Sequence, residues 1–367
     1  VLIGVCFDRR ALSLRSVAMA ALVVLMLWPE SITGPGFQMS FAATTALVVV
    51  YTGLTDKGWW QDLPKWVSGP ASLVLSSLVA GLATAPIAAA HFNILAHYGL
   101  LANVLSVPLM GTVVMPGALL ALAGAPLGLD WFGFWIMEQG VAWILGVAGY
   151  VADLPGAVGR VVSPGPAVLP LIVAGGLLLA LAAHPIRWLG AAHLGLAMAL
   201  WSVTDRPQLL VSESGLLLGL MSGEGRVLSK PRGDGFAARS WLENDGDLAD
   251  QATAAGRTGF ENGKGRVDLR VGALEVTQLR GKTGAAQLDD ACATADVIIL
   301  ASGSDRRAGC PIIDLDQLRE NGALALSYRN GELQIIGAKD VAGTRIWTPH
   351  QREPKNEPPA LTLVKAQ

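Results

Sequence analysis

The fold is decided by residues 80–129, AGLATAPIAAAHFNILAHYGLLANVLSVPLMGTVVMPGALLALAGAPLGL. This stretch contains no Asp, Glu, Lys or Arg, yet prolines interrupt its apolar runs at Pro86, Pro108 and Pro116. Prolines at these positions would break a helix in water, whereas neighbouring membrane helices and hydroxyl side chains can satisfy the freed carbonyls. Recurrent Gly, Ala, Ser and Thr allow membrane helices to approach closely. The stretch therefore predicts two interrupted membrane helices joined by a short loop over 91–99.

Two interpretations of these interrupted helices remain open at this point. Irregular helices at membrane depth are tolerated where they line a cavity or lie buried in protein, which favours a transport pathway. Ordinary structural spans would show the same apolar pattern.

The composition supports a large membrane part. The chain has 367 residues, of which 52% are hydrophobic and only 15% are charged, whereas soluble domains carry about 25% charged residues. Residues 1–203 hold seven of the 27 Lys/Arg and seven of the 29 Asp/Glu, so the charge is concentrated after residue 203. Neither part is strongly basic, which argues against an extensive electrostatic surface for nucleic acid.

The predicted fold class is a polytopic α-helical membrane domain followed by a small mixed α/β soluble domain. The membrane domain covers 1–203, the α/β domain 204–350 and a disordered tail 351–367. About seven spans are expected, some of them broken by Pro or Gly. Apolar runs place these spans at residues 14–28, 37–51, 71–90, 100–123, 131–151, 167–183 and 186–203.

The basic residues of short loops predict the orientation. Placing Arg9, Arg10 and Arg15 in the cytoplasm and crossing seven times leaves Arg187 inside and only Arg160 outside. On this count the domain after residue 203 is extracytoplasmic.

Short strands and turns fill the second domain. Strands are expected within 208–229, a hairpin within 267–280, a buried strand over 296–302 and a last hairpin around Asn330-Gly331. A short helix is expected over 289–295, and the Gly-rich segment 244–265 is predicted to be a loop.

Two motifs carry a family resemblance. GFQMSF at 36–41 and LANVLSVPL at 101–109 follow one another in the order and spacing of the ComEC family, inner-membrane channels for DNA uptake in natural competence. The resemblance implies a channel component that passes single-stranded DNA through the cell inner membrane, with the lipid bilayer and other competence proteins as further partners. Members of that family begin with another soluble domain and more spans, so an N-terminally truncated chain is expected.

The second domain lies where many members of that family carry a metallo-β-lactamase-like domain. That domain needs a His-x-His-x-Asp-His cluster to hold its metals, and residues 204–367 contain only His350. The run from Cys292 to Trp347 resembles the metal-free tails of some ComEC proteins, so we expect a degenerate relative, with no metal, no cofactor and no enzymatic activity. Gly281-Lys282-Thr283 matches only the end of a phosphate-loop motif. Val276 replaces its first Gly and no clear helix follows, so we interpret it as a chance match.

Four polar residues are candidates for the transport path: Gln38, Ser40, Asn103 and Glu138. A carboxyl group in a span is costly in lipid, so Glu138 is expected to face the protein interior or a water-filled cavity. Each of these residues can instead make an ordinary contact between helices. A small-solute or ion transporter with Glu138 as a proton relay, and an inactive remnant of a truncated gene, remain the alternative functions.

The sequence contains three cysteines, and Cys6 lies in the first apolar segment. Cys292 and Cys310 are therefore the candidates for a disulfide within the second domain, which an oxidising compartment would preserve. Two buried free thiols are the alternative.

Overall fold

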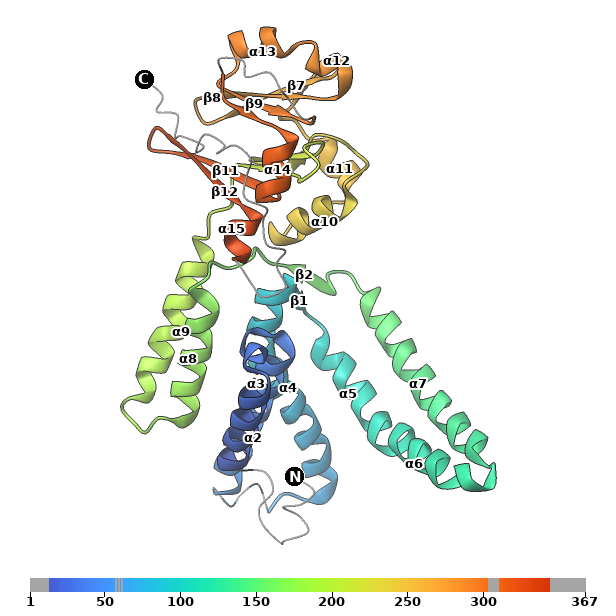
Figure 1. The fold of residues 1–367 in the computed structure, drawn as a ribbon. Helices are drawn as coiled ribbons and strands as arrows, with labels where there is room; N and C mark the ends of the chain where they lie inside the picture. The colour runs from blue at the N-terminus through green and yellow to red at the C-terminus, as the bar shows by residue number, and fades with distance from the viewer. Residues whose placement is uncertain (1–12, 57, 59, 61, 303–309, 344–367) are drawn as a thin grey trace. The chain divides into compact units, whose positions relative to one another are not determined.

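The computed structural model describes residues 13–302, except 57, 59 and 61, and residues 310–343 (Figure 1). The chain forms two compact units, residues 1–204 and 205–367. The first unit is almost entirely helical, and the second contains the two large sheets.

Helices occupy all seven segments that the sequence marks as spans. They are α2 (Leu14–Leu27), α3 (Pro35–Thr55), α4 (Lys65–Phe92), the continuous run α5–η2–α6–η3, α7 (Asp130–Ala152), α8 (Val168–Leu181) and α9 (Arg187–Ser202). The continuous run comprises α5 (Gly99–Leu109), the π-helical η2 (Met110–Val114), α6 (Met115–Gly124) and η3 (Ala125–Leu127). A short 3-10 helix, η1 (Pro29–Thr33), joins α2 to α3.

Among the described residues, four of these segments are long and apolar enough to cross a membrane: 35–55, 65–92, 99–127 and 130–152. α2 and α8 have 14 residues each, about 21 Å of helix against a hydrocarbon core of about 30 Å. The expected count of about seven spans is therefore not confirmed, although helices lie at the expected positions.

The prolines of the central stretch are accommodated inside these helices. Pro86 lies within α4 and Pro108 within α5. The π-helical segment follows Pro108 at once, and the hydroxyl of Thr112 donates to the Pro108 carbonyl at 2.7 Å. Pro116 lies in the first turn of α6. The helices thus continue past their prolines, with a π-helical segment after Pro108 and a hydroxyl bond from Thr112 to the carbonyl four residues before it.

α6 and α7 pack backbone against backbone through glycines. A Cβ atom on Gly133 would lie 2.1 Å from the Ala121 nitrogen, and one on Gly117 would lie 2.9 Å from the Met137 nitrogen. A Cβ on Gly140 would lie 2.6 Å from the Val114 side chain. Only glycine fits at these three contacts, so they fix the register of the α6–α7 hairpin.

The second unit contains two five-stranded sheets. One has the order β12-β11-β3-β4-β5 and is antiparallel throughout. The other has the order β10-β9-β8-β7-β6, with β8, β9 and β10 parallel. The strands of the first sheet are β3 (Leu209–Val211), β4 (Leu218–Ser222), β5 (Gly225–Leu228), β11 (Leu324–Arg329) and β12 (Glu332–Gly337). Those of the second are β6 (Glu261–Asn262), β7 (Arg266–Val271), β8 (Leu274–Leu279), β9 (Val297–Leu300) and β10 (Ile312–Ile313).

The two sheets enclose one apolar core, which draws residues such as Leu209 and Leu326 from one sheet and Val276 and Ile299 from the other. α10 (Gly235–Asn244) and α11 (Gln251–Ala255) cover the outer face of the first sheet. α13 (Leu288–Thr294) covers that of the second. The unit is therefore a four-layer α/β/β/α sandwich (Figure 1). The remaining helices are α12 (Gly281–Ala285), α14 (Leu315–Asn321) and α15 (Ala338–Ala342).

Most of the expected strands are present, including the hairpin whose turn, Asn330-Gly331, has positive φ at both residues. Two expectations were wrong. The segment 244–265, predicted to be a loop, contains α11 and β6. Gly281-Lys282-Thr283 forms the start of a short helix, α12, and α13 follows it. The predicted tail 351–367 lies outside the described residues.

A buried ion-pair network holds α10 against its sheet. Arg226 is fully buried and pairs with Asp245 at the end of α10, while Arg206 reaches the same carboxylate at 2.7 Å. Beside it, Arg257 bonds Asp247 and holds the pKa of that carboxyl below its usual value. These charges are compensated locally, so the network is structural.

The α6–α7 contact gives a test with a matched control. We expect Gly133→Ala to destabilise the protein by about 1–3 kcal/mol, because its methyl group cannot fit against the Ala121 backbone. Gly146 lies in the same helix with no atom within 4 Å of its Cβ position, so Gly146→Ala should leave stability unchanged or raise it slightly, because Ala favours the helix over Gly. Thermal unfolding in detergent micelles measures both; equal transition temperatures would contradict the proposed close packing.

Candidate functional site

The structure brings Gln38 and His91 together at adjoining ends of α3 and α4. The Gln38 amide nitrogen donates to the Ile32 carbonyl at 2.8 Å, and the Gln38 oxygen lies 2.8 Å from His91 Nε2. Because that oxygen can only accept, His91 Nε2 carries the hydrogen. The amide thus links the turn before α3 to the last turn of α4.

A polar connector continues from this point. Asn93 is buried, adopts the left-handed conformation with φ 57°, and ends α4. Its side-chain nitrogen donates to Ser163 Oγ at 2.8 Å and to the Val161 carbonyl at 3.2 Å. β1 (Ile94–Ala96) then pairs antiparallel with β2 (Val158–Arg160). The loop between α4 and α5 is thereby fixed to the segment between α7 and α8.

Further hydrogen bonds fix this two-stranded ribbon at both ends. His97 Nδ1 lies 2.7 Å from the Gly156 carbonyl, and the His97 ring occupies the space that a Cβ on Gly159 would need. The indole nitrogen of Trp201 donates to the Val162 carbonyl at 2.7 Å. Helices α4, α5, α7, α8 and α9 therefore share one ordered polar connection.

The other predicted path residues lie apart from this cluster. Ser40, Asn103 and Glu138 are exposed on α3, α5 and α7 respectively. Among the described residues, no hydrogen bond or ion pair joins any of them to Gln38. Glu138 is exposed on α7, and its placement toward the protein interior or a water-filled cavity stays a prediction.

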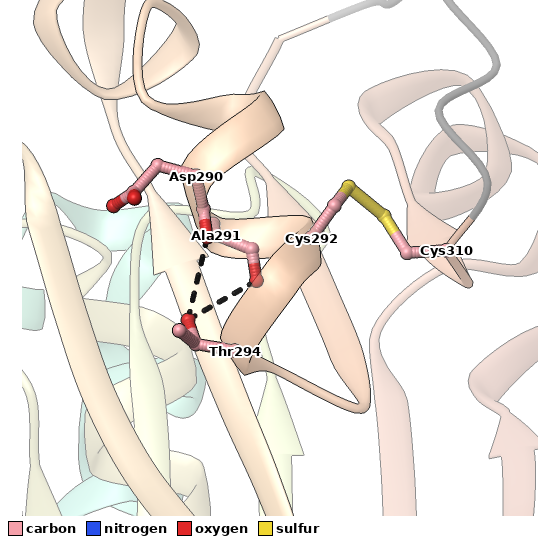
Figure 2. The surroundings of a disulfide bond; sticks show 5 residues. All are labelled: Asp290, Ala291, Cys292, Thr294 and Cys310. Carbon is pink, nitrogen blue, oxygen red and sulfur yellow. Dashed lines mark hydrogen bonds between the residues drawn. A yellow bond between two sulfur atoms is a disulfide. The ribbon is translucent and has the colours of Figure 1, made fainter.

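Cys292 and Cys310 are joined in a disulfide with their Cα atoms 5.5 Å apart (Figure 2). Cys292 lies in α13, where the Thr294 hydroxyl bonds the carbonyls of Asp290 and Ala291. Cys310 precedes β10, and both cysteines pack against the apolar cluster under α13. The bond ties α13 to the strand at the sheet edge.

The described residues offer no group of three or more His, Cys, Asp or Glu side chains that could hold a metal ion. At the carboxyl ends of the parallel strands β8, β9 and β10 stand Arg280, Ser302 and Asp314. One carboxylate and an arginine do not fit a two-metal hydrolase centre, which requires several imidazole and carboxylate ligands.

The helical unit matches the sequence model of a protein family described as Competence protein, over residues 1–185. The chain belongs to the Competence protein family. This match confirms the resemblance carried by residues 36–41 and 101–109 and covers α2 through α8. No curated protein and no solved structure matches the chain.

Sequence reasoning about this Competence protein selected Gln38 but missed its partner. His91 lies 53 positions further along the chain, and no local pattern pairs them. The buried role of Asn93 was missed for the same reason. The sequence feature that could have indicated Asn93 is an Asn at the end of an apolar helix, where the left-handed conformation is common.

The contact between Gln38 and His91 should be energetically coupled. In a double-mutant cycle with Gln38→Ala and His91→Ala, we expect a coupling of about 0.6–1.7 kcal/mol, as found for hydrogen bonds between membrane helices. Unfolding free energies in mixed micelles give the value. Gln38→Ala combined with His97→Ala is the control, because His97 bonds Gly156 instead. Additive effects in both cycles would refute the contact.

Proposed function

We propose that this Competence protein is an inner-membrane channel component that carries single-stranded DNA into the cell during natural transformation. The observation that carries the proposal is the match to the Competence family over residues 1–185. Helices long and apolar enough to cross a membrane lie within that match and support a membrane location. Other competence proteins would deliver the strand and supply the energy.

The proposed path is lined by polar groups of the spans, with Gln38, Ser40, Asn103 and Glu138 as candidates. Hydrogen-bonding side chains suit a passing strand, because each contact is weak enough to release it. The free-energy cost of placing the Glu138 carboxylate in lipid supports this placement. A central charge in lipid costs about 2.5–3.5 kcal/mol on insertion scales, so an exposed carboxyl group on α7 favours water or protein, not lipid, on that face.

For the second unit we propose a degenerate relative of the metallo-β-lactamase domain with no enzymatic role and no cofactor. Its four-layer α/β/β/α arrangement supports the relationship.

We also propose that the second unit is extracytoplasmic. Seven crossings from a cytoplasmic N-terminus would place it there, whereas four would leave both ends on the same side. The disulfide between Cys292 and Cys310 favours the outer side, because such bonds persist in oxidising compartments and are rare in the cytoplasm.

The function is tested by measuring labelled DNA that reaches the cytosol of competent cells. A strain lacking this chain should take up none, and the wild-type chain should restore uptake. Glu138→Leu should restore markedly less at equal protein abundance, because it removes the polar group from the proposed path. Leu145→Ile, an exposed position on the same helix, should restore it fully. Undiminished uptake in the deletion strain would refute the channel function. Full rescue by Glu138→Leu would show that uptake does not depend on this carboxyl group.

The location is tested by thiol labelling of intact cells that produce the Cys6→Ser chain. A membrane-impermeant maleimide should not label Cys292 or Cys310 until an impermeant reductant opens their bond. Labelling only after lysis, or labelling of both cysteines without reductant, would contradict an extracytoplasmic disulfide-bonded domain.

A further inference from the structure

Two glycine-rich turns lie side by side at one end of the second sheet. Gly263–Gly265 leads into β7, and Arg280–Gly284 follows β8. The Arg280 backbone nitrogen donates to the Gly265 carbonyl at 2.8 Å. A Cβ on Gly284 would lie 2.4 Å from the Gly265 oxygen, so no side chain can separate the two turns.

A side chain also clamps these turns together. The Gln287 amide nitrogen donates to the Lys264 carbonyl and to the Thr283 carbonyl, each at 3.1 Å. The positions of Lys264, Arg280 and Lys282 are thereby fixed relative to one another through their backbones.

The three basic side chains lack partners. Lys264 and Lys282 are exposed and Arg280 is partly buried. None of the three side chains makes a hydrogen bond or ion pair with a described residue. Neither turn contains an acidic residue, so the positive charge of this end is uncompensated within the turns.

Arg280 differs from the other arginines of its unit. The described arginines of the second unit that are partly or fully buried and have a carboxylate partner are Arg206, Arg226, Arg257 and Arg266. Arg280 is partly withdrawn from water and pairs with no carboxylate of a described residue, and burial lowers the pKa of its guanidinium. Burying an unpaired charge is unfavourable, so retaining it is explained best by a ligand that supplies the missing anion.

We propose that Lys264, Arg280 and Lys282 form a binding site for phosphate groups. A guanidinium binds two phosphate oxygens at once, and the ammonium groups add charge on either turn. Three basic residues on two adjoining turns suit consecutive phosphates of a single strand better than one isolated anion. This choice of a DNA strand as the source of the phosphates rests on the proposed function; the phosphate site itself does not.

The test uses the full chain in nanodiscs of zwitterionic lipid and a fluorescent oligothymidylate followed by anisotropy. Arg280→Gln should weaken binding about tenfold and make the slope of log K against log salt less negative by about 0.7, the loss of one single-strand phosphate contact. Arg270→Gln is the matched control, because Arg270 is an exposed arginine of β7 already paired with Glu275. It should keep the wild-type affinity and slope.

Stability separates a binding role from a structural one. Arg280→Gln should unfold at the wild-type temperature or above it, because it removes an unpaired, partly desolvated charge. Sodium phosphate, compared with sodium chloride at equal ionic strength, should raise the unfolding temperature of the wild type and of Arg270→Gln but not of Arg280→Gln. Arg280→Lys keeps the charge without the planar fork and should bind with intermediate affinity.

Three outcomes of these measurements distinguish the phosphate site from the proposed function. Equal oligonucleotide affinity and equal phosphate protection in wild type and Arg280→Gln would overturn the site. Protection by phosphate that depends on Arg280, without oligonucleotide binding, would support the site with a free phosphate compound as ligand and count against the DNA strand. DNA uptake that needs the chain but not Arg280, with no phosphate protection, would leave the proposed function standing and refute this inference.

Discussion

Backbone hydrogen bonding in an apolar environment is the constraint on which the helical unit depends. The central stretch combines prolines with apolar residues, so its freed carbonyls need partners that water cannot supply. The helix continues past Pro108 through the π-helical segment Met110–Val114, and the Thr112 hydroxyl donates a hydrogen bond to the Pro108 carbonyl. At the helix end the buried amide of Asn93 binds the chain between α7 and α8. Each interruption thus becomes a fixed connection rather than a flexible hinge.

Helices and strands were predictable from the sequence where a run of apolar residues or a turn dipeptide stood out from its neighbours. Apolar runs located the described α-helices of the first unit, and Asn330-Gly331 located the last hairpin, since both residues tolerate positive φ. The five-residue α11 and the two-residue β6 fall below any periodic signal, which is why 244–265 reads as a loop. The candidate site was less predictable. Contacts across 53 residues, such as Gln38 with His91, leave no local trace, and the exposure of Glu138 depends on how α7 packs.

The second unit manages its charges by pairing them. Asp245 forms ion pairs with Arg206 and with the fully buried Arg226, and Asp247 forms one with Arg257. Removing one partner of such a buried pair leaves an uncompensated charge, so this network fixes α10 and α11 on their sheet. Arg280 departs from that rule at the opposite sheet. Among the described residues of this unit, the other partly or fully buried arginines each pair with a carboxylate, which sets Arg280 apart.

The packing of α7 explains why its exposed carboxyl group matters. One face of the helix carries Gly133 and Gly140 against α6 with no room for a methyl group, so the helix cannot rotate about its axis without opening that contact. Glu138 is therefore held on the outer face, beside the exposed rings of Trp131 and Trp135. Neither rotation nor a partner within the described chain can relieve its cost in lipid. In a bilayer, contact of this face of α7 with water or with a polar protein surface would avoid that cost, whereas contact with lipid would not.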